Sequence, residues 1–417
     1  MSDWRETTVG EIASGFLSGG TPATSSPEFW EGDIPWITSK WLGKALELTD
    51  GEKFISEEAV HHSATKVAPK DSIIFATRVG VGKVGINRID LAINQDLAGI
   101  LIDNEKHDIK FLAYQLGVDS IQKYVEMNKR GATIKGITRD CLEKIRLNLP
   151  PLPEQKAIAH ILSTVQRAIA AQERIIQTTT ELKKALMQKL FTEGLRGEPQ
   201  NETEIGLVPE SWEVVPLSST CNFLSGGTPS KQNPDFWHGS ITWVSPKDMK
   251  KPRLNDAQDH ISQEALESGS KLAPAGSVLV VVRGMILAKT VPVALAEVPM
   301  AINQDMKAIV PGAKLRPDFL LYALETLRDN LFRRVGRSGH GTCTLMGHEV
   351  AAFKIPLPSI EEQDTIAAAA TSLELKIEIH QAKHEQLHAL FKTLLDELMA
   401  AKIRIHALEL TAGARAR

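Results

Sequence analysis

The chain has 417 residues, of which 42% are hydrophobic and 24% are charged, and its formal net charge is −3. This length allows two or three domains with sizeable cores, and the composition excludes a disordered or fibrous chain. No apolar run approaches the ~18 residues of a membrane span, and the net charge gives no overall nucleic-acid signal, so any DNA contact must come from local basic patches.

An internal repeat covers most of the chain. Phe16-Leu-Ser-Gly-Gly-Thr-Pro22 recurs as Phe223–Pro229, and Ala92-Ile-Asn-Gln-Asp96 recurs as Ala301–Asp305. A repeat of this length indicates two copies of one structural unit. We therefore expect the order domain, helix, domain, helix.

Within each half, short β-branched runs bounded by Gly and Pro predict strands, for example at 72–77 and 277–282. Apolar residues at helical spacing predict helices at 111–125 and 317–334. The expected fold class is α+β, with two repeated, mainly-β domains that are each followed by a long helix. Proline clusters and a polar stretch at 197–204, interpreted as the linker between the halves, set the expected boundaries. These are 1–152 for the first domain, 153–197 for the first long helix, 198–357 for the linker and second domain, and 358–417 for the second long helix and C-terminal tail.

Both long segments lack helix breakers and carry apolar residues at heptad spacing. The seam of the first consists of Ile158, Leu162, Val165, Ile169, Ile176, Leu186 and Leu190. The seam of the second consists of Ile366, Leu373, Ile377, Leu387, Phe391, Leu394 and Leu398, and its pattern continues through Ala401, Ile405 and Leu408. Because two such seams need partners, we expect the helices to pair as an antiparallel coiled coil. The alternative is that each helix packs only on its own domain.

Two locally basic segments occupy equivalent places, after the predicted helix and before the last strand of each domain. Basic side chains beside small hydroxyl residues suit contacts with phosphates and base edges. Including a glycine-rich turn flanked by Arg78 and Lys83, the candidate DNA-binding residues of the first half are Thr21, Lys40, Arg78, Lys83, Lys129, Arg130, Thr133 and Lys135. Those of the second half are Thr228, Lys231, Lys247, Arg283, Lys289, Arg333, Arg334 and Arg337.

Three motifs have a second interpretation. Gly80–Gly85 fits G-x-G-x-x-G, but the residues that follow it predict a strand, which disfavours a dinucleotide site. Asn-Gln-Asp at 94–96 and 303–305 is interpreted as a turn or cap, although Asn and Gln also pair with adenine. Ser-Gly-Gly-Thr-Pro is either a turn with positive-φ glycines or a loop placed against DNA, and the tryptophans near it are expected in the core.

No catalytic or metal-binding motif is present in the sequence. His380 and His384 lie four residues apart, a spacing that is compatible with a metal site, but on a coiled-coil seam they are interpreted as interhelical polar pairs that fix the register. Three widely spaced cysteines argue against disulfides and a zinc site. The N-terminal residues lack a signal-peptide pattern. We therefore expect a cytoplasmic, non-catalytic chain that binds no metal and no cofactor of its own.

The whole pattern resembles the DNA-specificity subunit of type I restriction–modification enzymes. The likeness rests on Ser18–Pro22 with Trp36, on Leu149-Pro-Pro-Leu-Pro-Glu-Gln155, and on Ile205–Trp212. The second half repeats it with Ser225–Pro229, Trp243 and Ile355–Gln363. One departure is that Arg283-Gly284 lacks the glycines of the first arginine–glycine turn, so the two domains are expected to contact DNA differently.

The resemblance implies that each domain reads one half of a bipartite DNA site and that the helices fix the gap. Methyltransferase subunits, two in number, would bring S-adenosylmethionine and methylate adenine N6, and ATP-dependent restriction subunits would join them. Two alternatives stay open. The chain is either a repeat scaffold that assembles protein partners through its coiled coil without base-specific contact, or a regulator that binds DNA alone.

Overall fold

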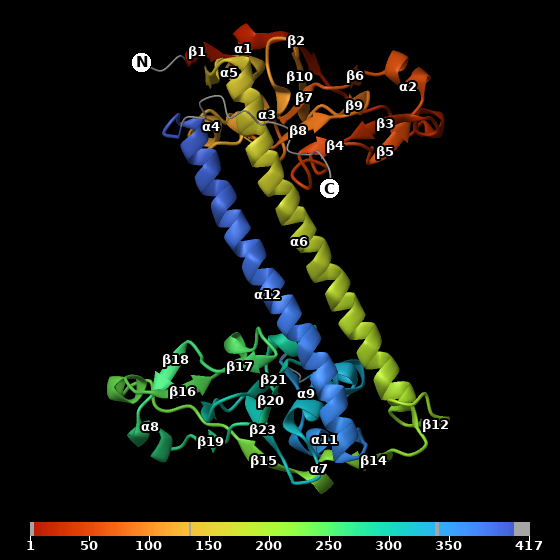
Figure 1. The fold of residues 1–417 in the computed structure, drawn as a ribbon, viewed down its shortest axis with the longest axis vertical. Coiled ribbons are helices and arrows are strands. Elements are labelled where there is room, and N and C mark those ends of the chain that lie inside the picture. Colours follow the sequence, from red (N-terminus) through yellow and green to blue (C-terminus); the bar gives the residue numbers. More distant parts are fainter. Residues whose placement is uncertain (1–3, 133–134, 338–341, 404–417) are drawn as a thin grey trace, which may run out of the picture. The chain divides into compact units, whose positions relative to one another are not determined.

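The computed structural model describes residues 4–132, 135–337 and 342–403. It divides into two compact units, which are described separately (Figure 1). Unit 1 combines Met1–Glu173 with Ala382–Arg417, and unit 2 comprises Arg174–Gln381. Each unit therefore contains one globular domain and a part of both long helices. Within the described ranges, no helix combines the length and the apolar character that crossing a membrane requires.

The domain of unit 1 is built on two mixed sheets and a pair of strands. The five-stranded sheet has the order β2 (Ala13–Ser18), β10 (Leu97–Ile102), β7 (Ile73–Ala76), β8 (Val84–Asn87) and β4 (Glu47–Leu48). The four-stranded sheet has the order β5 (Lys53–Ile55), β3 (Ile34–Ile37), β9 (Leu91–Ile93) and β6 (Lys66–Ala68). Strand β1 (Arg5–Thr8) pairs with β11 (Arg146–Leu149) just before the first long helix.

The helices of unit 1 connect these strands and cover one sheet. They are α1 (Val9–Ile12), α2 (Glu57–His62), α3 (Ile109–Leu116), α4 (Asp119–Met127), α5 (Arg139–Glu143) and the start of α6 (Leu152–Glu193), with a 3₁₀ turn η1 (Pro27–Trp30). The single helix predicted over 111–125 is therefore two helices. The break falls at Gly117, which caps α3, and Val118 then starts α4 from an extended conformation.

The domain of unit 2 repeats this topology strand for strand. Its five-stranded sheet has the order β15 (Cys221–Ser225), β23 (Met306–Pro311), β20 (Val278–Val281), β21 (Val293–Ala296) and β17 (Arg253–Leu254). Its four-stranded sheet has the order β18 (Asp259–Ile261), β16 (Ile241–Val244), β22 (Met300–Ile302) and β19 (Leu272–Ala273). The α+β fold of two repeated domains is thus confirmed.

Three strand pairs and several helices complete unit 2. The pairs are β12 (Gln200–Thr203) with β13 (Gly206–Pro209), β14 (Glu213–Pro216) with β26 (Lys354–Leu357), and β24 (Gly336–Arg337) with β25 (Cys343–Thr344). The helices are α7 (Leu217–Thr220), α8 (Gln263–Glu267), α9 (Pro317–Thr326), α10 (Arg328–Phe332), α11 (Gly347–Ala351) and the start of α12 (Ile360–Met399), with 3₁₀ turns η2 (Pro234–Trp237), η3 (Pro246–Asp248) and η4 (Met285–Ala288). The stretch 197–204, interpreted as a linker, contributes β12 to a hairpin.

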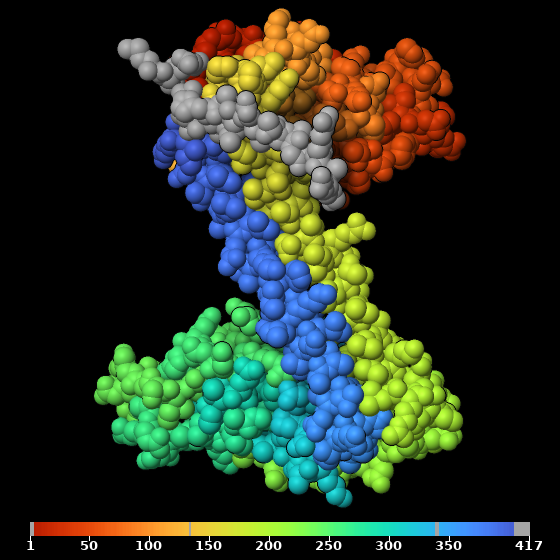
Figure 2. Space-filling model, in the orientation of Figure 1, coloured from red at the N-terminus to blue at the C-terminus, as the bar shows by residue number. Residues whose placement is uncertain are grey.

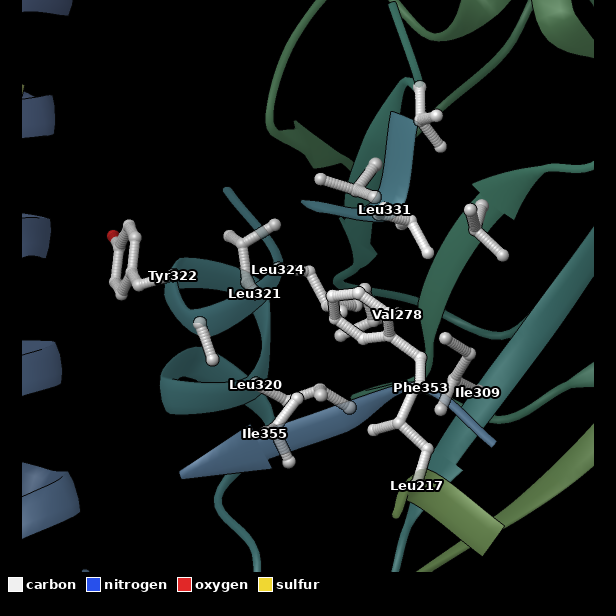
Figure 3. Close-up of a cluster of buried hydrophobic side chains, with 14 of the residues drawn as sticks. Leu217, Val278, Ile309, Leu320, Leu321, Tyr322, Leu324, Leu331, Phe353 and Ile355 are labelled. Carbon is white, nitrogen blue, oxygen red and sulfur yellow. The ribbon is translucent and has the colours of Figure 1, made fainter. Parts of the chain in front are cut away.

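Each domain has a core between its sheet and its helices. In unit 2, apolar residues of α9 pack with Val278, Ile309 and Phe353 (Figure 3). Tyr322 of the same helix points away from this cluster, and its hydroxyl donates a hydrogen bond of 2.9 Å to Glu374 of α12. All three cysteines are free, and Cys221 and Cys343 are buried. Helix α12 is therefore held on the domain of unit 2 by the hydrogen bond from Tyr322 as well as by apolar packing.

A glutamine in the first turn fixes the start of each long helix. Gln155 is buried, donates to the carbonyl of Pro150 (2.9 Å) and accepts from the backbone N–H of Asp108 (3.0 Å). Gln363 repeats these contacts with Pro358 (2.9 Å) and Arg316 (2.8 Å). Burying an amide side chain requires that its donor and acceptor are both satisfied. The Leu-Pro-x-x-x-Glu-Gln motif, at 149–155 and 357–363, is therefore a structural clamp between helix and domain.

The two long helices pair antiparallel. In unit 2, Lys183 Nζ lies 2.8 Å from Glu374 Oε1, and Leu195 N lies 3.4 Å from Glu362 Oε1. Leu195 follows Lys183 by twelve residues, whereas Glu362 precedes Glu374 by twelve residues. Equal steps in opposite directions define the register. In unit 1, Glu173 contacts His384 in this same register, at 3.1 Å. The expected pairing of the helices is confirmed.

The seam residues face this pairing or the domains. Ile158, Leu162, Ile169, Ile366 and Leu398 are buried. The other nine are half-buried: Val165, Ile176, Leu186, Leu190, Leu373, Ile377, Leu387, Phe391 and Leu394. Figure 2 shows the first part of α12, in blue, lying against the domain of unit 2. The seam was expected to continue through Ala401, but α12 ends at Met399, and Ala401 has a φ of 54° that a helix excludes. Ile405 and Leu408 lie outside the described residues.

Candidate nucleic-acid interface

The Ser-Gly-Gly-Thr-Pro loop of unit 1 packs tightly on the Asn-Gln-Asp turn. A Cβ on Gly19 would lie 2.2 Å from the carbonyl oxygens of Ile93 and Asn94. The Gly20 N–H donates to Ile93 (3.0 Å), and the Gly20 carbonyl accepts from the Trp36 indole (3.2 Å). Neither Gly19 nor Gly20 has a positive φ, so the interpretation of this loop as a turn with positive-φ glycines is wrong. Glycine is needed here because two backbones approach closely.

The loop of unit 2 has the same construction. A Cβ on Gly226 would lie 2.0 Å from the carbonyl oxygen of Asn303. The Gly227 N–H donates to Ile302 (2.9 Å), and its carbonyl accepts from the Trp243 indole (3.1 Å). Trp36 and Trp243 are buried as expected, whereas Trp30 and Trp237 are only half-buried. Both domains therefore hold this loop rigidly in the same place.

The Asn-Gln-Asp turn divides its residues between structure and surface. Buried Asn94 accepts from the Asp96 N–H (3.1 Å), and Asn303 accepts from the Asp305 N–H (2.9 Å). This agrees with the interpretation as a turn. The glutamine between them is exposed in both copies, where Gln95 bonds with Thr21 and Gln304 bonds with Thr228. An exposed amide held by a hydroxyl is available to a ligand.

A cleft of about 590 Å³ opens between this loop, the end of β7 and the start of α5 in unit 1. Three arginines line it: Arg78 after β7, Arg130 after α4, and Arg139 at the first position of α5. The backbone of Arg130 pairs with Gly136, and the Arg139 guanidinium lies over the Phe16 ring, 4.9 Å from its centroid. The polar groups of Ser18, Thr77, Gln95 and Thr138 also line the cleft. Guanidinium, hydroxyl and amide groups are those that contact phosphates and base edges.

Only two of the residues selected from the first half, Arg78 and Arg130, line this cleft. Lys83 instead donates to the Leu42 carbonyl (3.2 Å), and Lys129 forms an ion pair with Glu126. Lys40 and Lys135 are exposed outside the cleft lining, and Thr133 lies outside the described residues. Thr21 reaches the cleft only through its bond with Gln95.

Several residues selected from the second half are also held by other protein groups. Lys247 lies 2.7 Å from Asp259, whose hydrogen bond raises the pKa of the lysine. Arg334 pairs with Glu349 at 3.2 Å and lies over the Phe353 ring, and Arg333 donates to Asn330. Arg283 is mostly exposed, 3.9 Å from Asp305. Arg337, Lys231, Lys289 and Thr228 are also exposed.

A compensating exchange distinguishes the equivalent site of unit 2. Ala98 pairs with Ser18 in unit 1, and Lys307 pairs with Ser225 in unit 2. Lys307 donates to the Ser225 hydroxyl at 2.9 Å. Arg139 is the first residue of α5 in unit 1, and the equivalent first residue of α11 in unit 2 is Gly347. A Cβ on Gly347 would lie 3.0 Å from Lys307 Cε. A cation is thus retained beside the loop, but it comes from a strand instead of a helix. Phe16 opens the repeated motif Phe16–Pro22, and Arg139 follows the basic segment that contains Arg130. No sequence motif marks Lys307.

The glycine-rich turn at 80–85 leads into strand β8 and not into a helix. Gly80 and Gly82 have φ values of 68° and 92°, and a Cβ on Gly85 would lie 2.9 Å from Leu42 and Leu48. These glycines serve a tight turn and close packing in the sheet. The structure therefore supports the prediction that this turn is not a dinucleotide site, because such a site requires the turn to open a helix.

The family model described as the type I restriction modification DNA specificity domain matches residues 1–181 and 209–389. The chain belongs to this family of specificity subunits. The matched ranges cover both domains and most of both long helices. Recognition of the family from the two repeated motifs is therefore confirmed.

Relatives within the family match either part or all of the chain. A specificity subunit of the type I enzymes EcoR124I/EcoR124II from Escherichia coli is 36% identical over 182 residues, which are 40% of this chain and 45% of that protein. The MjaVIII specificity subunit of Methanocaldococcus jannaschii is 25% identical over 433 aligned positions, with 97% of this chain and 93% of that protein covered. The crystal structure of an S subunit from M. genitalium shares the fold, with a TM-score of 0.63, 17% identity, and 95% and 96% of the two chains covered.

Proposed function

We propose that this specificity subunit directs a partner adenine-N6 methyltransferase, and a restriction nuclease where one is present, to a bipartite DNA site. Each globular domain reads one half-site, and the paired helices set the gap. The cleft of unit 1 is the observation that carries the proposal. Three arginines and four polar side chains line one hollow beside a rigid loop, which is what a surface needs to bind a duplex edge.

Within this proposal, the arginines have different roles. Arg139 is positioned by the Phe16 ring and by Glu143, 2.6 Å away, so its guanidinium is oriented before DNA arrives. A preorganised guanidinium suits bidentate contact with guanine. Arg78 and Arg130 are exposed, which suits contact with phosphates. In unit 2, Lys307 replaces the planar guanidinium by a point charge. The two domains are therefore expected to read different bases.

The proposed function is tested by mapping N6-methyladenine in the genome of cells that carry this gene and its neighbours, with and without this chain. We expect methylation at one two-part motif with a fixed gap, and its loss when the chain is deleted. Unchanged methylation, or a short continuous motif, would contradict the proposal. The repeat-scaffold alternative would then be favoured.

Replacing Arg78 or Arg130 by alanine is expected to weaken DNA binding by the chain in complex with its methyltransferase. Each substitution that removes one arginine–phosphate bond should make the slope of log K against log salt concentration shallower by about 0.9. Arg139→Ala should instead cost about 1–3 kcal/mol on the specific site and relax the motif at one position. Binding is measured by fluorescence anisotropy across a salt series.

Arg5→Ala is the matched control, because Arg5 is an exposed arginine of unit 1 on β1, outside the cleft lining. Its salt slope should equal that of the unsubstituted chain. If all four variants behave alike, the cleft does not contact DNA.

A further inference from the structure

Three potential metal ligands meet between α6 and α12 in unit 1. His384 and His388 lie four residues apart on α12, and Glu173 lies on α6. Their ligand atoms all lie within 4.8 Å of one another. His384 Nε2 is 3.1 Å from Glu173 Oε1, and the two imidazole rings pack edge to face with centroids 4.5 Å apart. In the part of the chain that the structure describes, this is the one such group.

The spacing on the helix produces this arrangement. Residues four apart lie on one face of an α-helix, one turn above the other, so two histidines at this spacing direct both rings to the same side. The antiparallel register then brings the carboxylate of Glu173 to the same point. His384 is half-buried, whereas His388 and Glu173 are exposed. An ion therefore has free access from solvent.

The donor set selects a class of metal. Two imidazoles and one carboxylate suit Zn²⁺ and neighbouring transition metals, whereas Mg²⁺ and Ca²⁺ prefer oxygen ligands. Bonds of about 2.0–2.1 Å in a tetrahedral site place neighbouring ligand atoms roughly 3.3 Å apart. The separation of 3.1 Å between His384 and Glu173 is already close to this value. Small rotations of exposed side chains complete the site.

An ion pair between His384 and Glu173 accounts for the contact of these two residues, but a metal site also accounts for the position of His388. Exposed ion pairs contribute about 0–1 kcal/mol, and this pair leaves the second imidazole without a role. Two neutral imidazoles beside one carboxylate are the state that a divalent ion stabilises.

We propose that Glu173, His384 and His388 bind one Zn²⁺ ion, or a transition-metal ion of similar chemistry, with water as the fourth ligand. The ion joins α6 to α12 across their antiparallel pairing. Because it binds only when both helices are in register, it stabilises that register by a free energy that rises with the logarithm of the free metal concentration once this exceeds the dissociation constant. Binding does not depend on the proposed DNA-directed function. If that function also holds, the ion stiffens the element that sets the gap.

The test uses the full chain, stripped of metal with a chelator, then titrated with ZnCl₂ alone in equilibrium dialysis at pH 8. We expect one tight equivalent per chain. H388Q and H384Q should each weaken this equivalent at least tenfold, and E173Q should weaken it less. Co²⁺ titrated into the unsubstituted chain should give visible d–d bands that H388Q removes, and Zn²⁺ should displace the Co²⁺.

H160Q is the control, because His160 is an exposed histidine on α6 of the same unit outside the ligand group. Its affinity for Zn²⁺ and its Co²⁺ spectrum should match those of the unsubstituted chain. Circular dichroism of each variant checks that the helices are intact. The proposal is overturned if no stoichiometric equivalent binds, or if the equivalent survives in the H384Q/H388Q double variant with unchanged affinity.

Discussion

Replacing Glu374 by leucine is expected to lower the free energy of unfolding of unit 2 by about 1–3 kcal/mol. Glu374 is buried on α12 and accepts from Arg253 Nε (3.0 Å), the Tyr322 hydroxyl (2.9 Å) and Lys183 Nζ (2.8 Å). Arg253 also reaches Asp318 at 2.6 Å. This network joins both long helices to the domain.

The cost comes from the partners that would be left behind. The side chains of Arg253 and Lys183 are only 17% and 15% exposed, so neither can recover full hydration. Arg253 would keep its bond to Asp318, and Lys183 would keep Glu325 at 3.3 Å, but each would lose one charged hydrogen bond at a place where water cannot fully replace it. Urea unfolding and hydrogen exchange of amides in α9 and in the first half of α12 measure this destabilisation.

The pH dependence gives an independent readout. Burial opposes the ionisation of Glu374, but hydrogen bonding and attraction from Lys183, with further bonds from Tyr322 and Arg253, lower its pKa below the usual value of 4.5. A carboxyl whose pKa is lower in the folded state adds stability above the unfolded pKa and loses it as pH falls. The difference in stability between the unsubstituted chain and Glu374→Leu should therefore shrink below about pH 4.5.

Glu378→Leu is the matched control, since Glu378 is exposed on the same helix one turn away. It should change the free energy of unfolding by less than about 0.5 kcal/mol. Equal effects of the two substitutions, or a difference between them that does not vary with pH, would show that the network does not hold the helices.

This network also shows a limit of sequence reasoning. In unit 1 the equivalent positions carry Glu47 on β4 and Lys110 on α3, 2.9 Å apart, where unit 2 has Arg253 and Asp318. The polarity of the ion pair is reversed between the repeats. On the long helix, the neutral Gln166 takes the place that Glu374 has in unit 2, and it accepts a hydrogen bond from Tyr114 at 2.7 Å. Aligning the halves by similarity hides such an exchange, because only distances reveal that both residues changed together.

The sequence predicted the features that are encoded locally or by repetition. Heptad spacing and proline clusters predicted α6 and α12, and the repeated motifs predicted one topology twice. Residues of the cleft were harder to select. Arg78 and Arg130 were found because they lie beside glycines in basic segments. Lys83 and Lys129 lie in the same segments, but Lys83 donates a hydrogen bond to the Leu42 carbonyl and Lys129 forms an ion pair with Glu126. The sequence of a basic segment does not distinguish a residue that lines the cleft from one that is bonded to another protein group.

The second large effect is expected from lengthening both helices together. The design inserts seven residues between Gln177 and Thr178 and seven between Ile379 and His380, which face each other in the register of the Lys183–Glu374 contact. Seven residues add about 10.5 Å of helix and preserve the heptad seam. If the helices set the gap, the methylated motif should keep both half-sites and gain about three unread base pairs, at ~3.4 Å each. Sequencing of methylated sites measures the gap.

Insertion into α6 alone is the control for this design. Seven unmatched residues shift every later contact of α6 against α12, so Lys183 would no longer meet Glu374. We expect this variant to lose stability and methylation together. A paired insertion that leaves the gap unchanged, or that alters either half-site, would contradict the proposed role of the helices.

The efficiency of the paired variant should fall even though its motif is intact. A heptad adds two full turns to a coiled coil, so it translates the helices without rotating them. Three base pairs, in contrast, turn the second half-site by roughly 100° around a duplex of ~10.5 base pairs per turn. Either the DNA or the helix pair must therefore twist to let both domains bind, and bending or twisting a short duplex costs several kcal/mol. Sites whose gap contains flexible TA or CA steps should be methylated first, because they lower this cost.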